Sequence, residues 1–272
     1  MEGLMEFAFS VPEFRRTSKG NLRHKLGDIL ILFILGRASK CITRAEIIEF
    51  GKHNLKKFRS MGMLRNGVPS ESTLCRVEQG IDENCLASHM TAFTEAFVNE
   101  ASPKGTEPDI ICVDGKAMRG TVQSNGKNPD IVSAYSKNTG ITLATEACRE
   151  KSNEIKAVPL LLAKLNLDGR VVTADAMSMQ KDIIDLIRGK GGDFIIELKA
   201  NQRALRYGIE DKIKSCVPMQ TYTEGPVLEH GRIETRTYRT YNGLNLIANK
   251  EKWGGNLTVI EFESSSEKKT PV

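Results

Sequence analysis

The sequence of 272 residues is poor in the side chains that usually build zinc sites, with only four histidines and six cysteines. The cysteines are scattered, and no two of them stand at C-x-x-C spacing. No zinc or dithiol motif is therefore indicated, and we expect reduced thiols in a cytoplasmic protein. Acidic residues interrupt the first segment and no basic stretch precedes an apolar run, which argues against a secretory signal.

Long apolar runs are also missing. The most apolar segment, Leu26 to Ala38, is short and contains Asp28, so a buried helix is favoured over a membrane span. A hydrophobic content of 40% and a charged content of 27% are ordinary for a globular chain with a sizeable core. The net charge of +5 and the pI of about 8.8 permit a polyanionic partner, although an ordinary solvated surface explains them equally well.

Residues 1–100 are expected to form a small all-helical domain, with helices over 26–36, 44–57, 71–80 and 83–100. Thr43, with Glu46 three residues later, has the spacing of a capping box at the start of the second of these helices. A basic arm precedes the helices and suggests docking on DNA, although no helix-turn-helix signature is present. Its residues are Arg15, Arg16, Lys19, Arg23 and Lys25.

Residues 101–108 have the composition of a linker, and the pattern beyond them changes to strands. The order is strand, hairpin, helix, strand, helix, strand, helix, which predicts an α/β fold over residues 109–217. We expect a ribonuclease-H-like mixed sheet with helices on both faces. The segment 218–272 is β-rich, with a polar end over 263–272 that lacks a packing pattern. The expected strands are 109–114, 131–135, 141–147, 171–175, 193–199, 221–223, 232–240, 244–247 and 257–262, and the expected helices 154–165, 180–188 and 204–214.

Two carboxylates close apolar strands in this pattern. Asp114 follows an apolar run and precedes Gly115, where we expect a sharp turn, and Asp175 follows Val171 to Ala174 in the same way. In the predicted strand order these two strands are neighbours, so both acids reach one edge of the sheet. Mg²⁺ or Mn²⁺ would relieve the repulsion between them and prefers oxygen ligands. The simpler alternative is two unrelated acids that cap loops or form salt bridges.

Several stretches resemble the H-repeat-associated insertion-sequence transposases, a family of the DDE group. The resemblance covers nearly the whole chain in order. The stretches that carry it in the second half are VDGKAMRG (113–120), IVSAY (131–135), KSNEIKAVPLL (151–161), TADAM (173–177), LKANQ (198–202) and HGRIETR (230–236). VPEFRR (11–16) and GVPSEST (67–73) are similar to the N-terminal domain that accompanies that family.

The resemblance implies a metal-dependent DNA transposase that cuts and joins phosphodiesters at the ends of an insertion sequence. Asp114 and Asp175 take the positions of the first two catalytic, metal-binding carboxylates, with Mg²⁺ or Mn²⁺ as cofactor. Double-stranded DNA, as element ends and as target, is the implied partner, no membrane is involved, and a homo-oligomer is left open. A metal-dependent nuclease unrelated to transposition is a further alternative.

The third carboxylate of that family is a late Glu within a His-Trp-x-Ile-Glu-Asn type motif, and this motif does not occur. The only tryptophan, Trp253, has no Ile-Glu after it. We therefore expect a chain truncated at its C-terminus and impaired in catalysis, with Glu234 as a weak alternative ligand. The competing function is a non-catalytic DNA-binding remnant, or an inhibitor of a full-length transposase.

Other polar residues have two readings each. Lys116 and Arg119 could bind phosphate or pair with Asp114, and Lys199 and Asn201 could bind phosphate or cap the next helix. Glu154 could complement a helix dipole or belong to the site, and the first reading is favoured. Arg232 and Arg236 could follow a DNA backbone or lie on a solvated hairpin.

Overall fold

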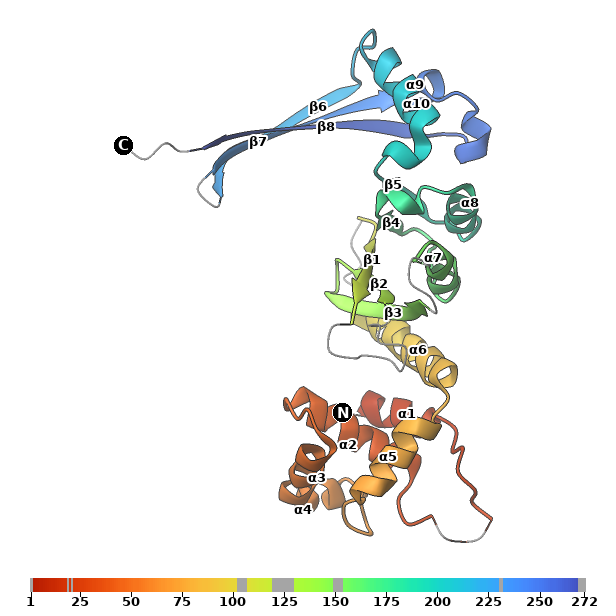
Figure 1. Cartoon of the computed structure of the whole chain (residues 1–272), viewed down its shortest axis with the longest axis vertical. Coiled ribbons are helices and arrows are strands. Elements are labelled where there is room, and N and C mark those ends of the chain that lie inside the picture. Colours follow the sequence, from red (N-terminus) through yellow and green to blue (C-terminus); the bar gives the residue numbers. More distant parts are fainter. Residues whose placement is uncertain are drawn as a thin grey trace. The chain divides into compact units, whose positions relative to one another are not determined.

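The computed structural model describes residues 2–18, 20, 22–101, 107–118, 130–148, 154–229 and 232–268. They divide into two compact units (Figure 1). The first comprises Met1–Lys104 with Ile141–Thr145, and the second Gly105–Gly140 with Glu146–Val272. Among the described helices, none combines the length and the apolar character that crossing a bilayer requires. Arg119, Lys19 and most of the predicted linker lie outside the described residues.

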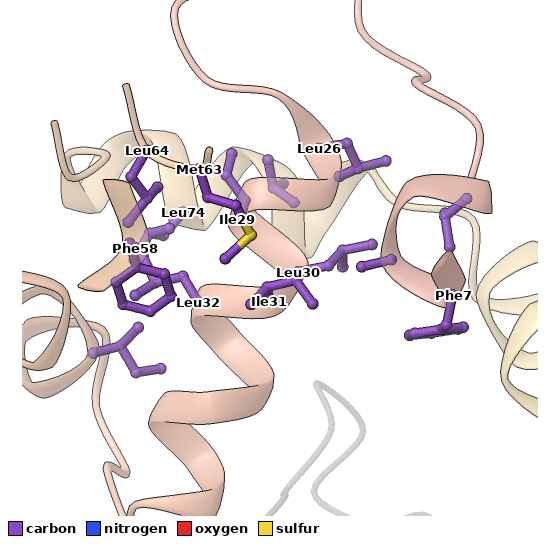
Figure 2. Close-up of a cluster of buried hydrophobic side chains, with 14 residues drawn as sticks. Phe7, Leu26, Ile29, Leu30, Ile31, Leu32, Phe58, Met63, Leu64 and Leu74 are labelled. Atoms are coloured by element: carbon purple, nitrogen blue, oxygen red, sulfur yellow. The ribbon is translucent and has the colours of Figure 1, made fainter. Parts of the chain in front are cut away.

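The first unit contains six described helices: α1 (Glu2–Ser10), α2 (Leu26–Ala38), α3 (Arg44–His53), α4 (Leu55–Ser60), α5 (Glu71–Gly80) and α6 (Glu83–Ala101). α2 runs through the core of this unit, where Ile29, Ile31 and Leu32 are fully buried (Figure 2). The predicted capping box is present, since Thr43 and Glu46 bond reciprocally to each other's backbone N–H. The single helix expected over 44–57 is divided at Asn54 into α3 and α4.

A five-stranded sheet follows in the order β3-β2-β1-β4-β5, and all of it except Ile141–Thr145 of β3 belongs to the second unit. Its strands are β1 (Ile110–Ala117), β2 (Asp130–Ser136), β3 (Ile141–Cys148), β4 (Val171–Ala174) and β5 (Asp193–Ile196). β1 pairs antiparallel with β2 and parallel with β4, and β4 pairs parallel with β5. The sequence-based expectation that the strands before Asp114 and Asp175 are neighbours is confirmed.

The two faces of this sheet differ in burial. α7 (Glu154–Ala163) and α8 (Lys181–Gly189) lie on one side of the sheet (Figure 1), and the side chains that face them, such as Ile111, Val132 and Val172, are at most 1% exposed. The alternate positions form the other face, where Tyr135 is 42% and Ile195 is 53% exposed. The expectation of helices on both faces is therefore not confirmed for the described part of the chain, because apolar alternation does not specify what covers a face.

A three-stranded antiparallel sheet, β6-β7-β8, follows in the same unit. Its strands are β6 (Gln220–Glu229), β7 (Arg232–Asn242) and β8 (Thr258–Lys268), with α9 (Arg203–Ile213), α10 (Gly243–Leu246) and two short 3₁₀ turns, η2 (Ala200–Gln202) and η3 (Lys250–Trp253), around them. Residues 244–247, expected as a strand, are mostly helical. Trp253 is buried beside Ile209 and Leu246, in a cluster that also contains Met179 and Ile184. The β-rich segment thus shares a hydrophobic core with α8 and α9.

Candidate functional site at the edge of the five-stranded sheet

Asp114 lies inside β1 and does not close it. The strand continues for three more residues to Ala117, because β2 pairs with it as far as Asp130. Gly115 is paired with Val132 and does not have a positive φ. The expectation of a sharp turn at this glycine is therefore wrong. The side chain of Asp114 is exposed and has no hydrogen-bond or ion-pair partner among the described residues.

Asp175 follows β4 directly, as expected. Val113 pairs with Ala174, so continuing the parallel register by one residue places Asp114 beside Asp175. Neighbouring strands lie about 4.8 Å apart, which brings the two backbone positions close together. Asp175 also caps η1 (Ala176–Ser178), since its Oδ1 accepts the N–H of Met177. One carboxylate oxygen of Asp175 is thereby fixed by the turn.

The turn after Asp175 is held by two amide side chains from the segment that follows β5. Asn201 Nδ2 donates to the carbonyl of Ala176 at 2.6 Å, and Gln202 Nε2 donates to the carbonyl of Met179 at 2.8 Å. Of the two readings for Asn201, phosphate binding or helix capping, neither describes this contact. Its amide positions the loop that carries Asp175.

Gly115 makes room for a third carboxylate. A Cβ added at Gly115 would lie 2.6 Å from both Cδ and Oε1 of Glu154 and 2.9 Å from Oε2. Glu154 is the first residue of α7 and is half-buried. It lines a small hollow together with Asp175, and the residues around that hollow are Val113, Gly115, Val132, Glu154, Ile155, Val158, Asp175, Met177 and Ser178.

The charges around this hollow are mainly negative. Burial raises the pKa of the Cys148 thiol, and the carboxylates of Glu154, Asp130 and Glu146 raise it further. The ammonium of Lys199, which follows β5, donates to Glu197 at 2.8 Å. That hydrogen bond raises the pKa of Lys199, and the negative charge of Asp175 adds to the effect. Lys199 is thus close enough to Asp175 to sense its charge.

The donor set fits a hard divalent cation in its chemistry, because Mg²⁺ and Mn²⁺ favour carboxylate oxygens. In the described part of the chain, however, no three His, Cys, Asp or Glu side chains are gathered closely enough to hold an ion. Carboxylates without a cation between them repel one another, which favours the separated arrangement.

The other predicted site residues fall into two groups. Lys116, Arg16 and Arg232 are exposed, and Lys199 is exposed although paired. Arg15, by contrast, donates to Glu13 and to the carbonyl of His24. Glu234 and Arg236 lie on β7, where Arg236 pairs with Glu234 at 2.8 Å and with Glu224 at 3.9 Å. Glu234 is not among the residues that line the hollow.

The sequence favoured a helix-dipole role for Glu154 and did not predict its contact with Gly115. A Glu at the first position of a helix is readily explained by the helix dipole. The sequence contains one indication of this contact: a glycine follows Asp114, and Glu154 is the first residue of the next helix. Only the packing of α7 beside β1 and β2 makes that pair a contact.

The chain is similar to known transposase domains over most of its length. Residues 105–270 match the model of the transposase DDE domain, and residues 7–94 match the model described as DDE_Tnp_1-associated. The chain belongs to the transposase DDE domain family. Members of this family use divalent metal ions. The expected membership in the H-repeat-associated transposases is confirmed by the relatives of this chain.

The relatives are similar over most of this chain. YncI of Escherichia coli K12 is 31% identical over 253 residues, which cover 89% of this chain and 97% of YncI. The H repeat-associated protein YbfD of the same strain is 31% identical over 245 residues, covering 88% and 93%. Other relatives are longer: the chain spans 62% of YncI from strain O157:H7 and 55% of the H repeat-associated protein YhhI.

Among solved structures, a piggyBac transposase synaptic complex with hairpin DNA matches 87% of this chain and 55% of its own, with 11% identity. Its TM-score of 0.35 is below the level at which a shared fold can be concluded.

Proposed function

We propose that this transposase-family chain cuts and joins DNA phosphodiesters at the ends of an insertion sequence, with Mg²⁺ or Mn²⁺ held by Asp114 and Asp175. The observation that carries the proposal is the parallel register of β1 and β4, which sets these two acids side by side. The strand order β3-β2-β1-β4-β5 supports a ribonuclease-H-like core. Exposed carboxylates on a rigid sheet edge are suited to holding a cation in a fixed position.

In this proposal, each part of the site has a separate task. Asp114 and Asp175 supply oxygen ligands from adjacent strands, while Asn201 keeps the Asp175 loop in place through its bond to Ala176. When bound, a divalent ion supplies Lewis acidity for phosphodiester cleavage and lowers the pKa of a bound water. Lys116 and Lys199 are exposed cations of the same unit and are proposed to contact the phosphate backbone of double-stranded DNA, as are Arg16 and Arg232.

A cleavage assay tests the catalytic proposal. The full chain would be incubated with Mn²⁺ and a duplex that carries the terminal repeat of the element. We expect nicking and strand transfer that are lost in Asp114→Asn and in Asp175→Asn. Asp185→Asn is the matched control, because Asp185 is an exposed acid that pairs with Lys181 in α8. Cleavage that survives both Asp→Asn changes would refute the assignment, and cleavage independent of the terminal repeat would favour the unrelated-nuclease alternative.

A binding assay separates catalysis from recognition. Backbone contacts release counterions, so DNA affinity is expected to fall steeply as salt rises from about 50 to 200 mM. Asp114→Asn should bind DNA at least as well as the unchanged chain, since it removes a negative charge. Binding without any metal-dependent cleavage would favour the non-catalytic, DNA-binding alternative. Affinity that does not change with salt would contradict both DNA functions.

A further inference from the structure

The positive charge of the chain is concentrated in one short stretch of the helical unit. Residues 37–65 contain eight Lys and Arg and two Glu, a net charge of +6. The whole chain carries +5, so all other residues together carry a net charge of −1. We propose that the surface formed by α4 and the end of α2 binds the phosphate backbone of double-stranded DNA. This inference rests on the proposed function and gives the helical unit a part in it.

α4 presents its cations from an anchored backbone. Phe58 is 2% exposed, belongs to the buried cluster of Figure 2, and lies edge-on to Phe50 with ring centroids 6.2 Å apart. Lys56, Lys57 and Arg59 surround Phe58 in the sequence and are all exposed. Since Phe58 turns inward, these three side chains occupy the outer side of the helix. They need little ordering of the backbone to contact a ligand.

The end of α2 adds a fourth cation to this surface. Lys57 lines a groove together with Ser39 and Met61, so the residue that ends α2 lies close to α4. Lys40 follows Ser39 directly and is exposed. Lys40, Lys56, Lys57 and Arg59 are called the α4 surface below.

The cations of the α4 surface are open to a ligand. None of the four has a hydrogen-bond or ion-pair partner for its side chain among the residues that the structure describes. In the basic arm, by contrast, Arg15 donates to Glu13 and to the carbonyl of His24. A paired cation has to give up its partner to bind phosphate, whereas an open one exchanges only counterions. The α4 surface is therefore better suited to DNA than Arg15 of the arm.

The distribution of acids favours a long polyanion as the ligand. Residues 50–70 contain no Asp or Glu, although they include five Lys and Arg. Duplex DNA carries one negative charge per about 1.7 Å of its axis, so a surface without acids avoids repulsion along the whole contact. Residues 78–100 of the same unit contain five acids and no Lys or Arg. This acidic region would repel DNA and so help to orient the unit on it.

The first test measures DNA affinity of the full chain by the fluorescence anisotropy of a labelled duplex of arbitrary sequence, in EDTA and at several salt concentrations. Lys57→Gln/Arg59→Gln removes two cations of the α4 surface. Each phosphate contact contributes about 0.9 to the slope of log affinity against log salt, so the slope should fall by about 1.8. At about 0.1 M salt this corresponds to a loss of roughly 60-fold in affinity. A second duplex of unrelated sequence should show the same loss.

Arg206→Gln/Lys214→Gln is the matched control. It also removes one Arg and one Lys, in α9 and directly after it, in the other unit. Each of these cations is already paired, Arg206 with Glu210 at 2.7 Å and Lys214 with Asp211 at 2.9 Å. We expect the affinity and the salt slope of this control to stay close to those of the unchanged chain. Melting temperatures of both variants should be unaltered, because surface changes of this kind affect stability little.

A second test locates the contact without any substitution. Lysine side chains of the full chain would be acetylated with and without the duplex, and the acetylation rate of each lysine would be read by mass spectrometry. We expect bound DNA to slow the acetylation of Lys40, Lys56 and Lys57 and to leave that of Lys214 unchanged. Equal rates at the α4 surface with and without DNA would overturn the inference.

The outcomes separate this inference from the proposed function. If the unchanged chain does not bind the duplex, the DNA function and the role of the α4 surface are both wrong. If the chain binds DNA but Lys57→Gln/Arg59→Gln has the affinity and slope of the control, only the role of the α4 surface is overturned. If polyglutamate displaces the duplex completely at an equal concentration of charge, the surface fits an acidic protein and DNA is overturned as its ligand. Because the assay contains EDTA, a failure of the metal site at Asp114 and Asp175 leaves this inference standing.

Discussion

The two compact units use their acidic side chains in different ways. In the described part of the helical unit, four acids accept hydrogen bonds from backbone N–H groups: Glu13 from Leu26, Asp28 from Leu64, Glu46 from Thr43 and Asp82 from Cys85. Each bond joins segments that are separate in space or starts a helix. These carboxylates satisfy backbone donors and so contribute to the fold itself.

In the sheet unit, the acids around the hollow have few partners among the described residues. Neither Asp114 nor Glu154 has a hydrogen-bond or ion-pair partner for its side chain among the described residues, and Asp175 has one oxygen bonded. A carboxylate whose oxygens are already bonded stabilises the fold and has little capacity for a ligand. A carboxylate that is held by a rigid strand or helix and has oxygens without a hydrogen-bond partner can bind a cation. The partners of a carboxylate, more than its presence, therefore distinguish a structural acid from a candidate ligand.

Asp28→Ala should produce the largest loss of stability among the changes that probe this contrast. Asp28 is 7% exposed, and its Oδ2 accepts the N–H of Leu64 at 3.0 Å. Leu64 is fully buried, so water cannot replace Asp28 as the acceptor for its N–H. Leaving a buried donor unsatisfied costs about 1–3 kcal/mol. Differential scanning calorimetry of the full chain would measure this loss, with Asp28→Asn, which keeps an acceptor, as the milder control.

Thr43→Ala should have a smaller effect. Thr43 Oγ1 accepts the N–H of Glu46 at 3.2 Å and begins α3, and removing such a cap costs about 1 kcal/mol. Thr43→Ser keeps the hydroxyl and should retain most of the stability in the same calorimetric measurement. Equal losses in the two variants would show that the methyl group of Thr43, and not its oxygen, contributes to stability.

The capping box was predictable because its determinants are local, and the pairing of the two acidic strands was predictable because it follows from the order of the elements. Thr43 and Glu46 are three residues apart, and the positions of Asp114 and Asp175 follow from apolar runs and the order of elements. The end of β1 was not predictable, since Lys116 and Ala117 are held in the strand by Ile131 and Asp130 of β2. The end of β8 was missed for the same reason, because β7 pairs with the polar residues beyond Phe262.

The contact between Gly115 and Glu154 lies further beyond the reach of sequence reasoning. A glycine after a strand acid is usually explained by backbone freedom, and a Glu at a helix start by the dipole. Each residue has a sufficient local explanation, and neither explanation predicts the contact between them. The contact depends on where α7 crosses the sheet, which no local pattern determines.

Glu13→Gln should act mainly through pH. Burial raises the pKa of the Glu13 carboxyl, but the hydrogen bonds and charge of Arg15 and the N–H of Leu26 outweigh it, so the pKa falls below its ordinary value of 4.5. A lowered pKa in the folded state gives stability that is present above pH 4.5 and is lost as pH falls through the lowered value.

At neutral pH, Glu13→Gln should cost less than about 1 kcal/mol, because the pair is partly solvated. Thermal melts between pH 6 and pH 3 should show a shallower decline for Glu13→Gln than for the unchanged chain. Parallel curves would mean that Glu13 does not contribute to acid sensitivity.

Asp114→Asn should have the smallest effect on stability and the clearest effect on metal binding. The side chain is exposed and has no partner among the residues that the structure describes, so its loss should change the free energy of unfolding by no more than about 0.5 kcal/mol. Removing one of several neighbouring negative charges could only relieve repulsion in the metal-free chain. Calorimetry with and without Mn²⁺ tests both effects. In Asp114→Asn, the rise in melting temperature that Mn²⁺ causes should disappear, while the melting temperature of the metal-free chain should stay the same. A large loss in the metal-free chain would instead place Asp114 with Asp28, as an acid that maintains the fold.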